Sequence, residues 1–493
     1  MKQAFNPYLP SYEYVPDGEP HVFDGRVYVY GSHDRFGAPV FCVNDYVCWS
    51  APVDDLAEWR YEGVIYRKTQ DPANPLGVRS LYAPDVTRGP DGRYYLYYAF
   101  DFMGQIGVAV CDTPAGKYEY LGKVCFADGH VWGTKSGEPF PFDPGVLTDD
   151  DGRVYLYAGF AVKVPRIASR FHDLTNEGGV VAELERDMLT IRSGPRLLFP
   201  ARGREGAFEN HAFFEASSIR KVDGKYCFVY SSEHNHELCY AMSDSPLGPF
   251  VFGGTLVDQG DLFLDHADER HAANYLGNTH GSIVEINGAW YVFYHRQTNR
   301  NSFARQACAE RLVRTADGFA QARVTSCGLN KGPLTGLGRY EARIACCLSS
   351  AAGTYRYDAL NRRKLLKKHP YFTQSGRDRE KDGDQYIANM RHGSYAGFRY
   401  FRLGEADMIS VELRGKGSGF ILVTDDEAMK NQCALIPFQI KRGTGSFASA
   451  FHCEQGERPL YFRMLGDGCI DFLAFELLKK NDENYTCGIP NGR

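Results

Sequence analysis

One hairpin motif recurs five times in this chain, and the repeat restricts the fold more than any other feature. Each copy is a strand, an Asp-Gly or Asn-Gly turn, and a second strand in which aromatic and aliphatic residues alternate. The turn glycines are Gly25, Gly92, Gly152, Gly224 and Gly288. The unit therefore recurs about every 65 residues, enough for a four-stranded propeller blade of roughly 40 to 50 residues with long loops. Because radial stacking covers both faces of such hairpins, the repeat predicts a five-bladed β-propeller.

The repeat stops before a segment rich in glycine and proline. Residues 326–340, SCGLNKGPLTGLGRY, are predicted as a linker. We therefore predict an all-β chain with a propeller over residues 1–325 and a β-sandwich, jelly-roll-like, over residues 341–480. Residues 481–493 are predicted as a frayed tail.

Short alternating segments support the sandwich prediction. They begin at Tyr386, Met408, Gly419 and Ile470. The charged run RDREKDGD, which begins at Arg377, is interpreted as a solvated loop. Its charges have no apolar pattern that would predict a buried strand.

Composition limits the partners and the compartment. The chain has 56 basic and 61 acidic residues and a net charge of −5, which argues against nucleic acid and anionic membranes as partners. The start of the chain lacks the apolar core of a secretion signal. Fourteen scattered cysteines without a CxxC pair are typical of reduced, buried thiols. We expect a cytoplasmic protein, and the sequence leaves its oligomeric state open.

Carboxylates near the inner strands are the candidates for chemistry, because the innermost strand of each blade borders the central channel. Asp17 and Asp143 precede the first and third hairpins, and Glu215 starts the fourth inner strand in NHAFFEASSIRK. The apolar residues before Glu215 predict a raised pKa through desolvation. Glu209 is the rival for Glu215, and Asp17 is also consistent with an ordinary Pro-Asp-Gly turn.

Five ordered motifs carry a family resemblance. They are PDGEPHVFDGRVYVYGSHD, SLYAPDV, FDPGVLTDDDGRVYLYAGF, FFEASSIRKVDGKYCFVYSSE and GNTHGSIVEINGAWYVFYHRQ. Their series resembles glycoside hydrolase family 43 over residues 6 to about 310. The resemblance implies a propeller glycosidase in which Asp17 is the general base, Asp143 orients and tunes the acid, and Glu215 is the general acid. Family members commonly have Asp-Pro where this chain has Asp17-Gly18, so Glu19 remains an alternative base.

The same resemblance suggests residues that bind the substrate or a metal. His280 resembles a histidine that lies beside a central metal ion or water cluster, and Arg305 resembles an arginine that contacts the sugar. Tyr82, which precedes Ala83-Pro84-Asp85, is expected to reach the pocket. A structural histidine and a salt bridge at the rim are the competing interpretations of His280 and Arg305.

The C-terminal region has a looser resemblance to a carbohydrate-binding module of family 6, through YIANMRHGSYAGFRYF and IDFLAFEL. Such modules often hold a structural calcium ion, for which Glu341 and Asp471 are the candidate ligands. A sandwich that only shields the propeller, or contributes to its pocket, is the competing interpretation.

The resemblance to family 43 implies an inverting exo-glycosidase that needs no cofactor and releases terminal arabinofuranose or xylose from plant-derived oligosaccharides. A β-D-galactofuranosidase, a glycoside phosphorylase and a carbohydrate-binding propeller without activity are the alternatives. A WD40 scaffold is disfavoured because the repeats lack its Trp-Asp and Gly-His marks and are about 20 residues longer.

Overall fold

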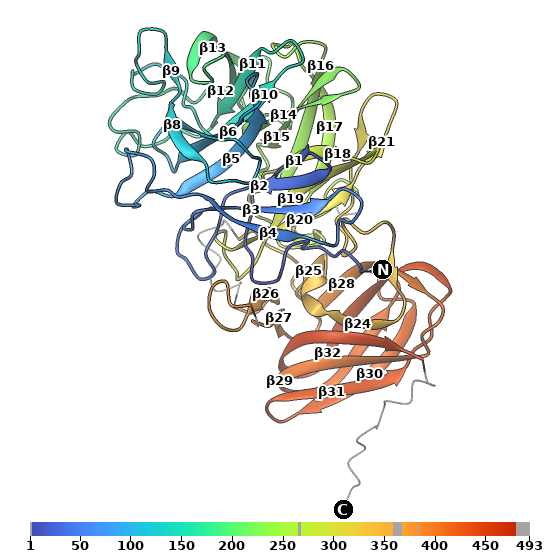
Figure 1. Ribbon diagram of the computed structural model, residues 1–493. Coiled ribbons are helices and arrows are strands. Elements are labelled where there is room, and N and C mark those ends of the chain that lie inside the picture. The colour runs from blue at the N-terminus through green and yellow to red at the C-terminus, as the bar shows by residue number, and fades with distance from the viewer. Residues whose placement is uncertain (1, 265–267, 358–366, 382, 480–493) are drawn as a thin grey trace, which may run out of the picture.

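The computed structural model describes residues 2–264, 268–357, 367–381 and 383–479. Its regular structure is almost entirely β and forms a propeller and a β-sandwich (Figure 1), so the predicted fold class is confirmed. Two short 3-10 turns, η1 (Glu269–His271) and η2 (Ala342–Ile344), are its helical elements. No helix in these residues has the length and apolarity to cross a membrane. The predicted tail, residues 481–493, lies outside the described residues.

Each predicted hairpin forms the inner half of one antiparallel blade. Blade 1 contains β1 (Glu19–Phe23), β2 (Arg26–Tyr30), β3 (Tyr46–Pro52) and β4 (Arg60–Tyr66). Blade 2 contains β5 (Leu81–Arg88), β6 (Tyr94–Phe100), β7 (Ile106–Cys111) and β8 (Glu119–Lys123). Blade 3 contains β10 (Gly145–Thr148), β11 (Val154–Gly159), β12 (Gly178–Leu184) and β13 (Thr190–Pro200), with β9 (Cys125–Phe126) parallel at its edge.

The last two blades follow the same order. Blade 4 contains β14 (Phe213–Val222), β15 (Lys225–Ser232), β16 (Glu237–Ser243) and β17 (Val251–Asp258). Blade 5 contains β18 (Ser282–Ile286), β19 (Ala289–Gln297) and β20 (Arg305–Arg311). A small ribbon of β21 (Val313–Arg314) and β22 (Phe319–Ala320) follows.

The hairpin turns show why the Asp-Gly and Asn-Gly pairs recur. In blade 4 both turn residues are left-handed, with φ of 50° at Asp223 and 77° at Gly224. A two-residue turn of this kind matches the twist of the flanking strands, and Asn, Asp and Gly adopt it most readily. The turn chemistry therefore fixes the register of each inner hairpin.

The ring of blades closes between the first and the last. The inner strands β1, β5, β10, β14 and β18 contact one another in this order around the channel, and β1 also contacts β18. Gly18 and Gly281 form a parallel bridge at this closure. Beyond β20, the Tyr8 amide donates to the Ala307 carbonyl at 3.2 Å, and Asn6 exchanges two hydrogen bonds with Ala309. The N-terminal segment thus lies along the outer edge of blade 5.

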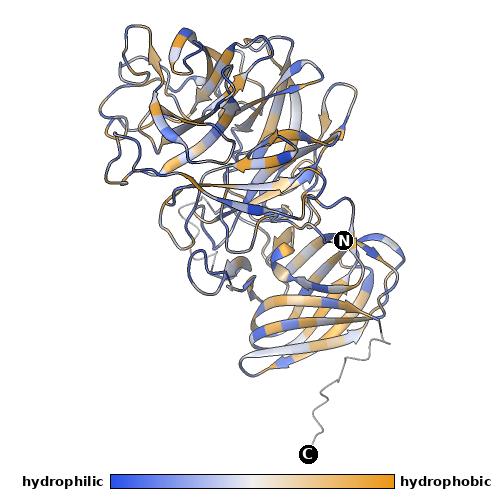
Figure 2. Cartoon of the chain, viewed as in Figure 1, coloured by the Kyte–Doolittle hydropathy of each residue, from blue (hydrophilic) through white to orange (hydrophobic). Residues whose placement is uncertain are grey.

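The apolar core of the propeller lies between successive blades. Figure 2 shows apolar residues concentrated on the strands of both domains. Tyr30 of blade 1 and Leu96 of blade 2 belong to one buried cluster, and Tyr157 of blade 3 and Phe228 of blade 4 belong to another. Aromatic and aliphatic residues therefore alternate along these strands because each face packs on a neighbouring blade.

The second domain is a β-sandwich, in which the described residues form ten strands. They are β23 (Leu334–Thr335), β24 (Gly338–Glu341), β25 (Cys347–Ser349), β26 (Tyr371–Gln374), β27 (Gln385–Met390), β28 (Tyr395–Leu403), β29 (Met408–Thr424), β30 (Gln432–Ile440), β31 (Thr444–Ala450) and β32 (Gly456–Leu478). Strand β23 lies within residues 326–340 and β24 begins there, so the sandwich begins inside the predicted linker.

Two long strands replace several short ones that the sequence predicts. The segments from Met408 and Gly419 are halves of β29, and the segment from Ile470 is part of β32. Gly419 and Gly466 face each other with φ of 146° and 141°, and a Cβ on either would lie within 2.2 Å of a carbonyl oxygen. Paired glycines allow a close backbone approach and a bend, which lets β29 and β32 continue where the sequence suggested a break.

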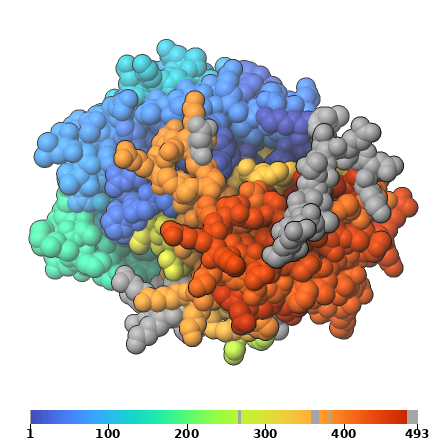
Figure 3. Space-filling model, turned by 90° about the horizontal axis from the view of Figure 1, so that it is seen from below, coloured from blue at the N-terminus to red at the C-terminus, as the bar shows by residue number. Residues whose placement is uncertain are grey.

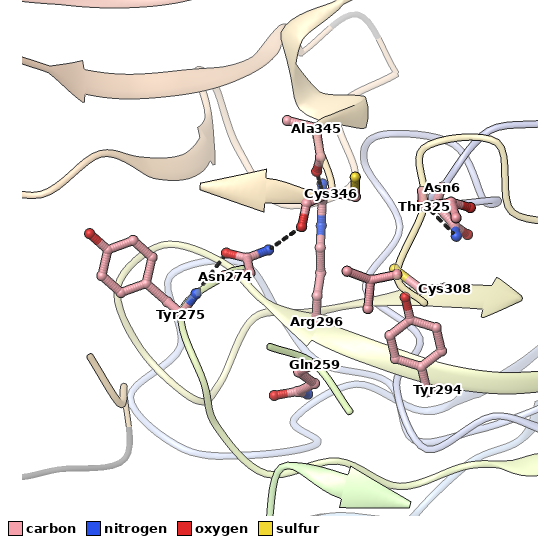
Figure 4. Close-up of a pocket in the computed structure, with 11 residues that line it drawn as sticks. Asn6, Gln259, Asn274, Tyr275, Tyr294, Arg296, Cys308, Thr325, Ala345 and Cys346 are labelled. Atoms are coloured by element: carbon pink, nitrogen blue, oxygen red, sulfur yellow. Dashed lines mark hydrogen bonds between the residues drawn. The ribbon is translucent and has the colours of Figure 1, made fainter. Parts of the chain in front are cut away.

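The sandwich packs directly on the propeller. The view from below shows it lying across the propeller (Figure 3). Arg296 of β19 donates to the Ala345 carbonyl at 2.8 Å and to the Arg343 carbonyl at 2.7 Å. Figure 4 shows this arginine and Asn274 reaching the segment around Cys346. The cavity between them measures about 20 Å³, room for about one water molecule, so it belongs to the interface and is too small for a substrate.

Candidate active site

Asp17, Asp143 and Glu215 line one pocket of about 200 Å³. Asp17 and Asp143 precede the inner strands β1 and β10, and Glu215 lies near the start of β14. The inner strands of different blades begin at the same end of the channel, so residues far apart in sequence meet there. The predicted catalytic residues therefore lie in a single site.

The backbone at these three positions has an unusual conformation. Asp17, Asp143 and Ala216, which follows Glu215, have φ of 57°, 45° and 67°. Residues other than glycine rarely adopt such values, which cost of order 1–3 kcal/mol each and cluster at functional sites. The strands thus turn sharply where each carboxyl group enters the pocket.

Asp17 is held as a carboxylate. Its Oδ1 accepts a hydrogen bond from Arg305 Nη1 at 2.8 Å, and its backbone amide donates to His295 Nδ1 at 3.3 Å. Burial opposes ionisation, but the charge of Arg305 together with smaller contributions from neighbouring groups such as His280 outweighs it, so the pKa of Asp17 is lowered. His295 Nε2 donates to the Asn278 carbonyl at 2.8 Å, and burial lowers the pKa of His295 to about 3. A neutral His295 therefore orients the Asp17 backbone.

Arg305 is itself fixed by a second aspartate. Its Nε and Nη2 donate to the two oxygens of Asp34 at 2.9 and 3.0 Å, a two-pronged geometry that suits guanidinium and carboxylate. Both side chains are buried. Arg305 also lines the pocket, as the resemblance implies for a residue that contacts the sugar.

Glu215 has the opposite proton affinity. Burial raises its pKa to about 8, and the charge of Asp143 adds to the effect. Phe160 and Phe214 line the same pocket and lie with ring centroids 5.6 Å apart. Glu215 therefore keeps its proton near neutral pH, whereas Asp17 does not.

Asp143 lies between the acid and a buried histidine. Its Oδ2 accepts a hydrogen bond from the Ala216 amide at 3.2 Å and lies 3.5 Å from His280 Nδ1. The other ring nitrogen of His280 lies 3.6 Å from Glu19 Oε1. Burial opposes protonation of His280, but its bonds to Asp143 and Glu19 outweigh it and raise its pKa well above the ordinary value. A charged His280, which itself lines the pocket, thus orients Asp143.

The propeller channel near His280 contains the guanidinium group of Arg220. Arg220 Nη2 donates to Glu19 Oε2 at 2.6 Å and lies 3.1 Å from His21 Nε2 and 3.8 Å from Asp85 Oδ1. Glu19, His21 and Asp85 are close enough together to ligate a metal ion, but the guanidinium of Arg220 already contacts all three. This group of side chains therefore does not fit a metal ion.

The structure also distinguishes Asp17 and Glu215 from the alternative residues considered for their roles. Glu19 is buried in the channel and is not among the pocket-lining residues, and Glu209 is solvent-exposed. Asp85 Oδ2 accepts a hydrogen bond from the Val146 amide at 2.8 Å, so it ties blade 2 to blade 3. Asp17 and Glu215 are thus favoured over their rivals.

Aromatic rings form the apolar wall of the pocket, and Tyr82 lies among them as predicted. The others are Phe41, Phe102, Phe142, Phe160 and Phe214. Rings of this kind supply flat apolar surface for the carbon face of a sugar. The wall is therefore suited to a small carbohydrate.

The predicted calcium ligands of the sandwich do not share a site. Glu341 pairs with Arg343, and Asp471 Oδ2 accepts a hydrogen bond from Arg414 Nε at 3.1 Å. Glu341 faces Ala474 across β24 and β32, three positions beyond Asp471. Each carboxylate already has a cationic partner, so these two residues do not form a calcium site.

Sequence reasoning missed His295, Asp34 and Arg220. His295 and Asp34 lie at or just beyond the ends of second strands, in YVFYHRQ and YVYGSHD, and Arg220 lies within an inner strand. A polar residue among apolar ones at a strand end was the available signal. Only the closure of the ring shows that these side chains converge.

A propeller whose channel mouth contains a carboxylate base, a protonated acid and a third carboxylate defines an acid–base glycosidase. A family model described as glycosyl hydrolases family 43 matches residues 15–320, and the chain belongs to this family.

Similar proteins cover either the whole chain or the propeller. A xylosidase/arabinosidase from Thermoclostridium stercorarium is 47% identical over 97% of this chain and 99% of its own length. A xylosidase/arabinosidase 43A from Humicola insolens is 33% identical over 57% of this chain and 88% of its own length. A family 43 enzyme from Xanthomonas citri, solved with xylose, is 27% identical with a TM-score of 0.51, and the match covers 65% of this chain and 93% of that one. The resemblance of the sandwich to a family 6 binding module stays a prediction.

Proposed function

We propose that this protein is an inverting, exo-acting glycosidase that releases terminal arabinofuranose or xylose from plant-derived oligosaccharides. The observation that carries the proposal is the pair of opposed proton affinities in one pocket. Arg305 lowers the pKa of Asp17, and burial raises the pKa of Glu215 to about 8. At neutral pH a base and an acid therefore face the same small cavity.

The mechanism follows from these protonation states. The Asp17 carboxylate removes a proton from water as the water oxygen attacks the anomeric carbon. The glycosidic carbon–oxygen bond breaks on the other side of the sugar, and Glu215 gives its proton to the leaving oxygen. Burial keeps Glu215 protonated, and the like charge of Asp143, which His280 orients, adds to this effect. One attack without a covalent intermediate inverts the anomeric configuration.

The size of the pocket supports exo action. Its volume of about 200 Å³ is below the roughly 300–1,000 Å³ typical of sites for larger ligands. Such a pocket suits one terminal sugar better than a long chain. The names of the relatives from T. stercorarium and H. insolens, both xylosidase/arabinosidase, support a terminal pentose.

The test is a panel of nitrophenyl α-L-arabinofuranoside, β-D-xyloside and β-D-galactofuranoside, assayed with and without phosphate. We expect turnover of one or both pentosides, independent of phosphate, with proton NMR showing inversion in the first product. Turnover of the galactofuranoside alone would select that alternative, and dependence on phosphate would select a phosphorylase. No turnover of any of the three would count against the proposal.

A further proposal concerns metal ions. Family 43 catalysis needs no cofactor, and we propose that Arg220 makes a metal ion in the channel unnecessary. A structural calcium ion elsewhere stays a prediction, which chelation followed by a melting curve tests.

Thirteen cysteines of the described residues are free, which supports our proposal of a reducing, cytoplasmic location. Cell fractionation tests this location.

A further inference from the structure

We infer that the sandwich helps to shape the active site: Asp378 and Arg379 are positioning residues that fix one wall of the sugar pocket. They lie in residues 375–381, here called the docking loop, between β26 and β27. The wall that they contact is residues 31–45, between β2 and β3, here called the wall segment. This inference deepens the proposed function, because it concerns which sugars the pocket accepts.

The docking loop contacts the wall segment through both side chains. Asp378 Oδ1 accepts a hydrogen bond from the Phe36 amide at 2.7 Å, and its Oδ2 accepts one from Asn44 Nδ2 at 3.3 Å. Arg379 Nη1 donates to His33 Nε2 at 2.8 Å. The sequence suggested a solvated loop here, and most of its residues are exposed, but the charges of Asp378 and Arg379 make contacts between the domains.

Arg379 also neutralises a buried acid of the propeller. Its Nη1 lies 2.8 Å from Glu13 Oε1, and Glu13 Oε2 accepts a hydrogen bond from Trp49 Nε1 at 2.7 Å. The Glu13 side chain is fully buried and Arg379 is 31% exposed. A buried carboxylate left without its cation is costly, so this pair fixes the loop in one position.

The wall segment connects these contacts to the catalytic base. Asn44 Nδ2 donates to the Asp34 carbonyl at 2.9 Å, and the Cys42 amide donates to Asp34 Oδ1 at 3.0 Å. Asp34 in turn holds Arg305, which holds Asp17. A shift of the wall segment therefore moves a residue that contacts the base.

The same segment carries part of the sugar wall. Phe41 and Cys42 line the pocket, and the Phe41 ring lies 4.8 Å from the Arg305 guanidinium. Phe41 also packs edge-on against Phe303, with ring centroids 4.7 Å apart. Movement of Phe41 would thus change the shape of the pocket as well as the position of Arg305.

A second wall also rests on the sandwich. The Asn299 amide donates to the Phe372 carbonyl of β26 at 2.7 Å, and the Arg300 guanidinium lies 4.2 Å from the Tyr371 ring. Ser302, two residues further on, lines the pocket. Two neighbouring segments of the sandwich therefore support two segments of the pocket.

The test measures kcat and KM of Asp378→Ala and Arg379→Ala on the aryl arabinofuranoside and xyloside. The matched controls are Asp384→Ala, whose carboxylate pairs with Arg414 inside the sandwich, and Lys381→Ala on the same loop. We expect kcat/KM to fall about ten- to hundredfold, as for a displacement of about 1 Å. The loss should be mainly in KM, with a changed ratio between the two sugars. Arg379→Lys should recover part of the activity, and both controls should match wild type.

Values of kcat/KM within about twofold of wild type on both sugars, with folding intact, would overturn the inference. If Asp378→Ala does not fold, Asp378→Asn, which keeps one acceptor oxygen, takes its place. Hydrogen exchange of the Phe36 amide gives a second measurement that needs no turnover: it should accelerate in the Asp378 variants and not in Asp384→Ala. An inactive wild type would refute the proposed function, whereas unchanged exchange at Phe36 would refute the docking contact alone.

Discussion

The charged residues of the propeller channel and those of the outer sandwich strands are arranged in opposite ways. In the channel, Arg305, Asp17 and Asp34 are buried and come from different strands and loops. In the sandwich, Arg339 of β24 pairs with Glu412 of β29, two strands that both pair with β32, and both side chains are at least one-third exposed. Buried charges that lie close together shift one another's pKa values in the channel. Ion pairs exposed to water in the sandwich are screened and interact only weakly.

The catalytic carboxylates should show the largest contrast. Asp17→Asn and Glu215→Gln should each reduce turnover of natural oligosaccharides by about 10² to 10⁴-fold or more. The control in the sandwich, Asp471→Asn, should leave turnover unchanged.

Aryl glycosides separate the two roles. A good leaving group needs little protonation, so Glu215→Gln should lose much less activity on aryl glycosides than on oligosaccharides. Asp17→Asn should lose activity on both, because water activation is needed in each case. Equal losses for Glu215→Gln on both substrates would remove its assignment as the acid.

Loss of the Arg220 guanidinium from the channel should have the next largest effect. Arg220→Gln removes the guanidinium that pairs with buried Glu19 and lies near buried Asp85, and breaking a buried pair costs about 3–5 kcal/mol. The four tryptophans lie before residue 291, so tryptophan fluorescence in urea follows unfolding of the propeller.

The matched change in the sandwich is Arg414→Gln, which removes two partly exposed pairs. Circular dichroism should show a cost of no more than about 1 kcal/mol. An equal cost for both variants would mean that burial of the channel charges has no special weight. Added calcium should not restore Arg220→Gln if the guanidinium, and not a metal ion, belongs in the channel.

The pH profile gives a smaller but more specific effect. Activity requires ionised Asp17 and protonated Glu215, so kcat/KM should fall on the basic side with an apparent pKa of about 8, as Glu215 loses its proton. It should fall on the acidic side only below the ordinary range of an aspartate, because the pKa of Asp17 is lowered. Asp143→Asn removes a like charge and should move the basic limb to lower pH. A basic limb that does not move would show that burial alone raises the pKa of Glu215.

The smallest effect is expected for a sandwich carboxylate. Glu341→Gln breaks a partly exposed pair with Arg343 and should change the free energy of unfolding by no more than about 1 kcal/mol. Calcium should not change the melting temperature of wild type or variant through this residue. A calcium-induced rise in wild type that is lost in Glu341→Gln would instead support the calcium prediction.

The repeated hairpins and the five blades could be predicted from the sequence, and the three carboxylates could be named there as candidates. Turn chemistry and alternation are local, so Gly25 and its four counterparts could be found without a structure. The tertiary structure decided the rest: that Arg220 fills the channel, that His295 and Asp34 hold the base, and that the loop around Asp378 contacts the propeller. These contacts join residues that are far apart in the sequence. They form only when the ring of blades closes and the second domain packs on it, so a local sequence pattern cannot show which side chains meet.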